Sequence, residues 1–192
     1  MHPDDRDPSS DPPSLPSAQV KERRESSVTI QAGRADLIPR LAPLWMALQK
    51  HHASIAPQIE RVRAFRTPEE SWSVRRRQYE QWLQHGDAQA LTAEQDGQAV
   101  GYAVVRIVPS GPTLQTEDRI GELVSLSVLP SSRDLGVGSR LMEEVHRWLA
   151  DMGVTTLTTS VLTNNTNAFR FYKRLGMVEL SVELVGTVPH RP

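Results

Sequence analysis

The chain has 192 residues, with 22 Lys and Arg against 23 Asp and Glu, and a formal net charge of -1 at pH 7. This length suits one domain with a hydrophobic core. The balanced charge argues against a nucleic-acid-binding protein, which would carry a strongly basic face. The absence of Cys excludes disulfides, thiolate metal sites and a Cys nucleophile; it fits a reducing compartment and is also compatible with export. Because no apolar run approaches the roughly 18 residues that span a bilayer, we expect a cytoplasmic protein with no membrane partner.

Residues 1–27 differ in composition from the rest of the chain. They contain five of the 14 prolines, six serines and no aromatic residue. Such a segment cannot bury enough apolar surface to offset the entropy lost on ordering, and its early acids and prolines do not look like a secretory signal. We therefore predict a disordered tail at residues 1–27, with a docking arm as the alternative, and one domain at residues 28–192.

The first half of the domain is predicted to contain one strand and two helices. Residues 28–32 are rich in β-branched side chains, which is typical of a strand. Apolar residues then recur at helical spacing over residues 37–48, although Pro43 should kink this helix or delay its start. Residues 51–66 are expected to be irregular.

The second helix carries a strong start signal. Thr67 can cap the helix, Pro68 suits its first position, and Glu70 completes a capping box. The buried side of this helix is predicted to consist of Trp72, Tyr79, Trp82 and Leu83.

The middle of the chain predicts three strands. Residues 90–95 and 98–108 are joined at Asp96-Gly97, a dipeptide that favours a tight hairpin. Residues 120–129 form the third strand.

The last part of the chain predicts alternating helices and strands. A helix over residues 138–151 is followed by a strand over residues 154–161 and a short helix that starts at Asn164 or Asn165. Residues 178–187 are expected to form a closing strand. The resulting order, β-α-α-β-β-β-α-β-α-β, predicts an α/β fold. Its central sheet is mixed and mostly antiparallel, with helices on both faces and one right-handed parallel β-α-β unit.

A candidate phosphate site lies where the third strand leads into a helix. Gly136 and Gly138 stand at the helix start, where free N–H groups and the helix dipole attract anions and where glycines allow close approach. A dinucleotide fingerprint would need a third glycine in place of Leu141, and no nucleoside-triphosphate loop is present.

Two blocks of the sequence resemble the GNAT family, the GCN5-related N-acetyltransferases. The pattern Arg133-x-x-Gly136-x-Gly138 follows a strand that ends in Val128, as in the acyl-CoA loop of that family. The second block contains Asn165, Ala168, Tyr172, Gly176 and Met177. One helix and one strand separate the blocks, as in the family, and the resemblance covers residues 28–185. It implies an acyl-CoA N-acyltransferase-like fold, whose usual last strand is not evident here.

The resemblance also implies acetyl-CoA as the cosubstrate. The residues expected to bind it are Val128, Arg133, Asp134, Leu135, Gly136, Val137, Gly138, Ser139 and Asn165. Asp134 and Leu135 depart from the family, which usually has Gly or a basic residue at these positions. The carboxylate of Asp134 would lie near the pyrophosphate, but the backbone donors remain. Asn165 would bind the pantetheine arm or an ordered water, and a helix N-cap is its alternative role.

Catalytic roles follow from the same resemblance. Tyr172 is the candidate acid that protonates the departing thiolate, with a core tyrosine as the alternative. The backbone N–H of Val128 would stabilise the charge on the carbonyl oxygen. Glu122 is the candidate base, with a solvated edge residue as the alternative. In a regular strand Glu122 shares a face with Val124, Leu126 and Val128, whereas Ser125 and Ser127 point the other way.

His51 and His52 are weaker candidates for the base, since neutral imidazole accepts a proton near pH 7. Either could instead be a favourable charge at a helix end. The six His residues show no metal-binding spacing, so we expect no metal.

The resemblance thus implies an enzyme that transfers an acetyl group from acetyl-CoA to the amine of a small molecule. Three alternatives remain: acetylation of a protein N-terminus or lysine, a non-catalytic acyl-CoA sensor, and an inactive family member. A homodimer is left open.

Overall fold

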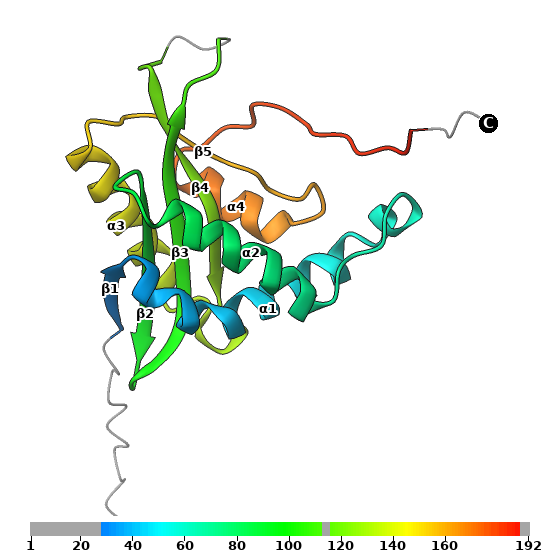
Figure 1. The fold of residues 1–192 in the computed structure, drawn as a ribbon, viewed down its shortest axis with the longest axis horizontal. Helices are drawn as coiled ribbons and strands as arrows, with labels where there is room; N and C mark the ends of the chain where they lie inside the picture. Colours follow the sequence, from blue (N-terminus) through cyan, green and yellow to red (C-terminus); the bar gives the residue numbers. More distant parts are fainter. Residues whose placement is uncertain (1–27, 113–115, 189–192) are drawn as a thin grey trace, which may run out of the picture.

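The computed structural model describes residues 28–112 and 116–188, so the tail predicted at residues 1–27 lies outside the described residues. Five strands form one sheet in the order β1-β2-β3-β4-β5 (Figure 1). The first four strands pair antiparallel, and β4 and β5 pair parallel. This arrangement confirms the predicted mixed sheet with one parallel β-α-β unit.

The elements follow the predicted order as far as the last helix. The strands are β1 (Thr29–Gly33), β2 (Ala88–Gln95), β3 (Gln98–Pro109), β4 (Arg119–Val128) and β5 (Leu157–Thr159). The α-helices are α1 (Ile38–Ile55), α2 (Pro68–Trp82), α3 (Val137–Asp151) and α4 (Thr166–Arg174), and the short 3-10 helices are η1 (Ala35–Leu37), η2 (Pro57–Arg61) and η3 (Pro130–Ser132).

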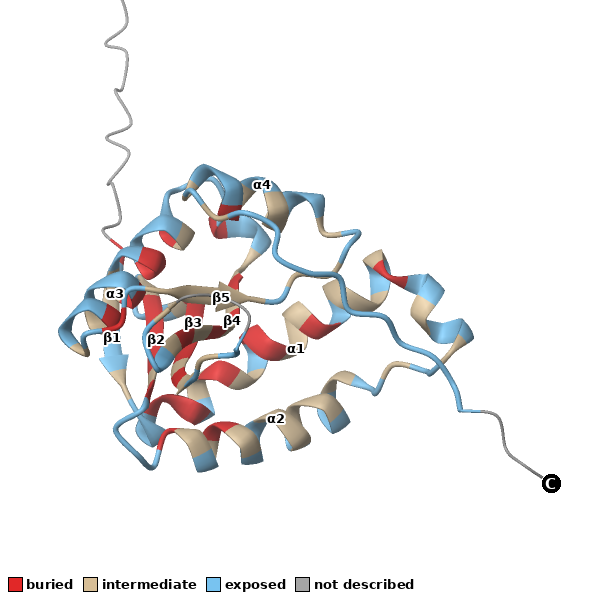
Figure 2. Ribbon diagram, turned by 90° about the horizontal axis from the view of Figure 1, so that it is seen from above, coloured by how far each residue is buried: buried red, intermediate tan, exposed pale blue. Residues whose placement is uncertain are grey.

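Helices cover both faces of the sheet, as Figure 2 shows. The α3 and α4 side encloses one apolar cluster, which includes Leu123, Leu141, Val145 and Tyr172. The α1 and α2 side encloses a second cluster, which includes Leu41, Leu44, Tyr79 and Tyr102. The sheet is therefore buried on both faces, and the ends and edges of its strands are the places left for a site.

The structure confirms two predicted local features, the capping box of α2 and the hairpin turn between β2 and β3. The Glu70 N–H donates to Thr67 Oγ1 at 3.2 Å and the Thr67 N–H donates to Glu70 Oε2 at 3.0 Å, which completes the capping box of α2. Asp96 and Gly97 have φ values of 52° and 78°, as a two-residue hairpin turn with positive φ at both central positions requires.

The first helix is longer than predicted. Pro43 lies inside α1, which starts at Ile38 and runs to Ile55, so the delayed start that Pro43 suggested does not occur. A proline removes one helical hydrogen bond, and the burial of Leu41 and Leu44 against the sheet outweighs that loss. The extension carries residues 51–55, predicted to be irregular, into the helix.

A bulge in β4 changes which residues share a face. Val104 of β3 pairs with Ser125 and Val105 pairs with Leu123, so Val124 is an extra residue in β4. The alternation reverses at Val124, so the prediction that Glu122 shares a face with Leu126 and Val128 is wrong. For the same reason Ser125 and Ser127 lie on the face of Glu122 and not on the opposite face as predicted.

Two predicted strands differ near the end of the chain. The strand expected at residues 154–161 is reduced to β5, with three residues. The strand expected at residues 178–187 is absent, because this stretch pairs with no other described strand. Its sequence has the alternation of a strand, but strand structure also requires a neighbour to accept its backbone hydrogen bonds.

Candidate functional site

The start of α3 forms a cradle of backbone N–H groups next to an exposed turn. Gly136 is the N-cap, with φ of 76°, and has no side chain to satisfy the first turn of the helix. The N–H groups of residues 137–139 therefore have no partner within the helix. Residues 133–136 are exposed on the preceding turn. Free N–H groups at a helix start attract anions, which is the basis of the phosphate site that the sequence predicts.

Asp134, which departs from the family pattern, occupies a position with a positive φ. Its φ is 62°, which glycine adopts without strain and which Asp tolerates better than most residues. The backbone turn is thus compatible with Asp134, although its carboxylate remains on the exposed surface beside the cradle. Leu135 is also exposed, at 59%.

Gly138 is required for packing as well as for access. A Cβ at this position would lie 3.3 Å from Cε2 and 3.4 Å from Cζ of Phe171. Since these distances are tighter than an ordinary contact, the glycine lets α3 approach α4 closely. The sequence analysis attributed Gly138 to phosphate access alone.

The ladder between β4 and β5 ends early. It contains three pairs and stops at Leu123 and Thr159, whereas β4 continues to Val128. The stretch of β4 beyond Leu123 thus has no partner on its β5 side among the described strands. We call the region between β4 and β5 beyond the last pair the opening.

Two backbone N–H groups of β4 face the opening. Along an antiparallel strand, successive N–H groups point alternately toward and away from the neighbouring strand. The Leu129 N–H points toward β3, because it donates to the Val100 carbonyl at 2.8 Å. The N–H groups of Val128 and Leu126 therefore point away from β3, toward the opening. Val128 was predicted from the sequence, but Leu126 was missed because its orientation follows from the register of the sheet.

Arg133 folds back onto the end of β4. Its Nε donates to the Val128 carbonyl at 3.2 Å, so the side chain of Arg133 joins the cradle to the opening.

Tyr172 lies at the end of the β4-β5 ladder. It is 9% exposed in the apolar cluster of α3 and α4, and its hydroxyl lies near Thr159, the last paired residue of β5. Burial raises the pKa of Tyr172 to about 12, and the polar interaction with Thr159 opposes this rise. The phenol is therefore protonated at neutral pH. Its position agrees with a core tyrosine and with a proton donor at the opening.

Glu122 forms an ion pair on the opposite face of the sheet. Arg106 Nε donates to Glu122 Oε2 at 2.6 Å, and the guanidinium of Arg106 lies 4.3 Å from the ring centroid of Trp82. The carboxylate is 34% exposed, so it is neither a fully solvated edge group nor a buried acid. The sequence analysis did not anticipate Arg106 as its partner.

Two asparagines organise the loop between β5 and α4. Asn165 Oδ1 accepts a hydrogen bond from the Ala168 N–H at 3.2 Å, which makes Asn165 the N-cap of α4. Its Nδ2 group carries its remaining donors. Asn164, which was not predicted as a site residue, donates through Nδ2 to the Ile55 carbonyl at 2.9 Å and to Gln58 Oε1 at 3.2 Å. The loop is thereby tied to the end of α1.

His51 and His52 lie on the last part of α1. Burial lowers the pKa of both, aided by the positive charge of Arg133 for His51 and by His51 for His52. Both rings are therefore neutral at pH 7, and the interaction with Arg133 indicates that this end of α1 lies near the cradle.

A sequence model of the acetyltransferase (GNAT) family matches residues 57–177, which is more than half of the chain. The chain belongs to the GNAT family. The match includes the cradle, β4, the opening and α4, so the resemblance predicted from two short blocks is confirmed.

Two relatives show how far sequence similarity extends. A mycothiol acetyltransferase of Sanguibacter keddieii is 31% identical over 105 residues, which cover 55% of this chain and 32% of that protein. An N-alpha-acetyltransferase of Sulfurisphaera tokodaii is 31% identical over 104 residues, which cover 52% of this chain and 62% of that protein. The chain thus spans less than two thirds of either relative.

Solved structures agree with the GNAT fold. An aminoglycoside N-acetyltransferase in complex with CoA superposes with a TM-score of 0.65 and 20% sequence identity, over 86% of this chain and 97% of that one. At this identity the similarity concerns the fold.

Within residues 28–112 and 116–188, no helix has the length and apolar character needed to cross a membrane. The same residues contain no group of three or more His, Cys, Asp or Glu side chains arranged to hold a metal ion.

The tyrosines provide a direct test of this packing. The chain has three, and burial raises the pKa of Tyr79, Tyr102 and Tyr172 above the usual value. We expect tyrosinate absorbance in the native protein to appear only well above pH ~10, whereas the unfolded chain should titrate near ~10. Stability from these groups is present below the unfolded pKa and is lost as pH rises through the folded pKa.

The Tyr172→Phe variant is the control, because it should remove the part of the native transition centred near pH 12. A native transition centred at the unfolded value would show that the three phenols are exposed to water.

Proposed function

We propose that this protein transfers an acetyl group from acetyl-CoA to the amine of a small molecule. The observation that carries the proposal is the early end of the β4-β5 ladder beside Tyr172, with the cradle at the start of α3. Membership of the GNAT family supports the reaction class. A mycothiol acetyltransferase and an aminoglycoside N-acetyltransferase among the similar proteins support a small acceptor.

The cradle would bind the diphosphate of acetyl-CoA through the N–H groups of residues 137–139. The dipole of α3 adds attraction for negative charge at these donors. Asn165 would contribute its Nδ2 group to the pantetheine arm. The thioester would then lie along the opening, where the N–H of Leu126 or Val128 can donate to its carbonyl oxygen as negative charge develops.

The base and the acid would act from opposite faces of the sheet. A lysine-like amine has a pKa near ~10.4, so at pH 7 only about one molecule in 2,500 is neutral, a cost of ~4.6 kcal/mol. Glu122 lies on the α2 face and would accept the proton of the amine. Tyr172 belongs to the α4 face and would donate its proton to the sulfur that departs.

Glu122 lies too far from the opening to accept the proton of the amine directly. A strand rises about 3.3 Å per residue, so Glu122 lies on the order of 10–13 Å from Leu126 along β4. An ordered water or the acceptor itself must span this distance. Arg106 would act as a positioning residue, because its two contacts hold Oε2 and direct the carboxylate.

Asn164 favours a small acceptor over a protein. Its bonds to Ile55 and Gln58 tie the β5-α4 loop to the end of α1. This bridge would obstruct an extended peptide that approached from the α1 side. The similarity to an N-alpha-acetyltransferase keeps a protein N-terminus as the second candidate acceptor.

Replacement of Asp134 tests cofactor binding. The Asp134→Asn variant keeps a residue that tolerates positive φ and removes a negative charge beside the cradle. We expect the dissociation constant for acetyl-CoA, measured by calorimetry, to fall about two- to fivefold, equivalent to ~0.5–1 kcal/mol. The control is Asp151→Asn at the opposite end of α3, which should bind like the wild type. An absence of heat at millimolar acetyl-CoA would rule out the proposed function.

The Tyr172→Phe variant tests the acid. Loss of the hydroxyl should lower kcat about 10²-fold and leave the affinity for acetyl-CoA unchanged, because the cradle is unaltered. A thiol-release assay over a panel of small amines measures the rate, and calorimetry measures the binding. Unchanged kcat would return Tyr172 to a purely structural role.

The Glu122→Gln variant tests the base. We expect the variant to lose the pH-dependent rise of kcat/KM that reports deprotonation of the catalytic base, with acetyl-CoA affinity unchanged. Matched His51→Gln and His52→Gln variants should retain that rise. If a histidine variant loses it and Glu122→Gln retains it, Glu122 is not the base.

A further inference from the structure

A pocket of about 200 Å³ lies between α1 and α2. Its lining consists of Trp45 from α1, Arg66 from the turn before α2, and Ser71, Val74, Arg75 and Gln78 from α2. Two of these side chains are positively charged, and none is an Asp or a Glu. The lining therefore carries positive charge that no lining carboxylate neutralises.

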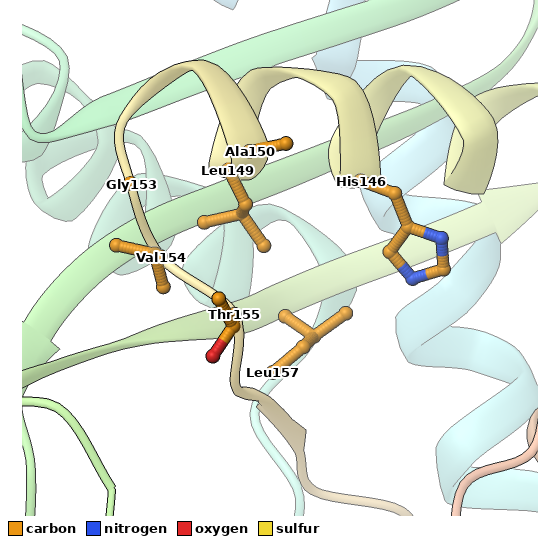
Figure 3. Close-up of a pocket in the computed structure, with 7 residues that line it drawn as sticks. All are labelled: His146, Leu149, Ala150, Gly153, Val154, Thr155 and Leu157. Carbon is orange, nitrogen blue, oxygen red and sulfur yellow. The ribbon is translucent and has the colours of Figure 1, made fainter.

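A second cavity, of about 390 Å³, lies beside β5 and has a different lining. Figure 3 shows that its side chains come from the end of α3 and from the segment that leads into β5. Leu149, Val154 and Leu157 form an apolar wall, and no Lys, Arg, Asp or Glu lines this cavity. It offers no fixed charge to a ligand, so the pocket between α1 and α2 is the better candidate for a polar site.

Arg75 is held in place by aromatic rings and not by an acid. Its guanidinium carbon lies 4.5 Å from the ring centroid of Trp45, 5.6 Å from that of Tyr79 and 5.8 Å from that of Trp82. Within residues 28–112 and 116–188, its side chain has no hydrogen bond or ion pair. Contacts with aromatic faces orient a guanidinium but leave its five N–H donors unused. Arg75 thus presents oriented donors to a ligand.

Ser71 and Gln78 add neutral hydrogen-bonding groups to the same pocket. The Trp45 Nε1–H donates to Ser71 Oγ at 3.2 Å, so the Ser71 hydroxyl keeps its own hydrogen for another acceptor. Gln78 contributes an amide with two N–H donors. Donors therefore come from charged and from neutral side chains.

Arg66 brings a second guanidinium to the pocket. Its carbonyl accepts a hydrogen bond from Gln49 Nε2 at 2.8 Å, which fixes the backbone of Arg66 beside α1. Its side chain is exposed and has no partner among the described residues. Because a guanidinium binds a carboxylate or a phosphate through two parallel hydrogen bonds, the pocket suits a small oxyanion.

The ring of Trp82 links this pocket to Glu122, the proposed base. The guanidinium of Arg75 lies 5.8 Å from the Trp82 ring centroid, and that of Arg106, which donates to Glu122, lies 4.3 Å from it. The two guanidinium groups thus contact the same ring on the α1 and α2 side of the sheet. An acceptor whose amine is directed to Glu122 has the guanidinium of Arg75 on the same side of the sheet.

We propose that the acceptor amine carries a negatively charged group, a carboxylate or a phosphate, which binds Arg75 and Arg66 in the pocket between α1 and α2. This inference rests on the proposed function, because it assigns the class of acceptor for that reaction. It also implies selection against polycations, since two guanidinium groups without a counter-charge repel a second positive charge on the acceptor. Aminoglycosides, which are polycations, are poor acceptors on this basis.

Matched amines test the preference for negative charge. In the thiol-release assay, ω-amino carboxylates of two to six carbon atoms are compared with their amides, and O-phosphoethanolamine is compared with ethanolamine. We expect the charged member of at least one pair to have a kcat/KM about 10- to 100-fold higher than its neutral partner, as hydrogen bonds to a charged group provide. The pair that shows the preference identifies the anion. Equal kcat/KM within every pair, or a preference for spermidine, would overturn the inference and leave the proposed function standing.

The Arg75→Gln variant tests the residue. It should lose about 10- to 100-fold in kcat/KM for the charged amine, and its kcat/KM for the neutral partner and its affinity for acetyl-CoA should not change. The matched control is Arg77→Gln, which removes the same charge from an exposed position of α2 outside the pocket and should behave like the wild type. Weaker acetyl-CoA binding by Arg75→Gln, or an equal loss in Arg77→Gln, would overturn the inference.

The Arg66→Gln variant keeps the test decisive if circular dichroism shows that Arg75→Gln is unfolded. Because the Arg66 side chain is exposed, its replacement should not affect folding. We expect a smaller but specific fall in kcat/KM for the charged amine. An unchanged preference for the charged amine in this variant would overturn the inference.

Binding without turnover separates this inference from the proposed function. If acetyl-CoA binds but no amine releases thiol, the proposed function fails, and tryptophan fluorescence is then followed during titration with 4-aminobutyrate and with O-phosphoethanolamine. Two of the four tryptophans, Trp45 and Trp82, lie against Arg75. A saturable change that Arg75→Gln loses and Arg77→Gln keeps would support the anion site. The absence of a saturable change in the wild type would overturn it.

Discussion

The three-pair ladder between β4 and β5 is the constraint on which the proposed site depends. It ends at Leu123 and Thr159, and the strands therefore separate where Tyr172 reaches the sheet. Beyond that point the N–H groups of Leu126 and Val128 have no strand partner on the side of the opening among the described residues. A longer ladder would satisfy these donors with β5 carbonyls and leave no place for a thioester.

The bulge at Val124 gives the two sides of the opening different chemistry. Before the bulge, Leu123 packs with the cluster of α3 and α4, while Glu122 faces α2 and Arg106. After the bulge, Ser125 faces α2 and accepts a hydrogen bond from the Tyr79 hydroxyl at 2.8 Å. One extra residue thus brings polar groups to the α2 face and leaves the α3 and α4 face apolar, apart from the phenol of Tyr172. The proposed proton acceptor, Glu122, and the proposed proton donor, Tyr172, thereby lie on opposite faces of the sheet.

Two places in the described part of the chain present backbone groups without a partner in a helix or strand. The start of α3 presents unsatisfied N–H groups, which suits a diphosphate. The outer edge of β5 has no strand partner among the described residues and lies beside an apolar cavity.

The sequence by itself determined the order of elements through α4, the capping box at Thr67, the hairpin at Asp96-Gly97 and the membership of the GNAT family. These features depend on residues close in sequence, whose side chains or φ angles decide the local structure. Only the tertiary structure decided the Arg106 partner of Glu122, the orientation of the Leu126 N–H and the unpaired state of residues 178–187. Each depends on what a distant strand or helix places opposite, and periodicity along one strand does not contain that information.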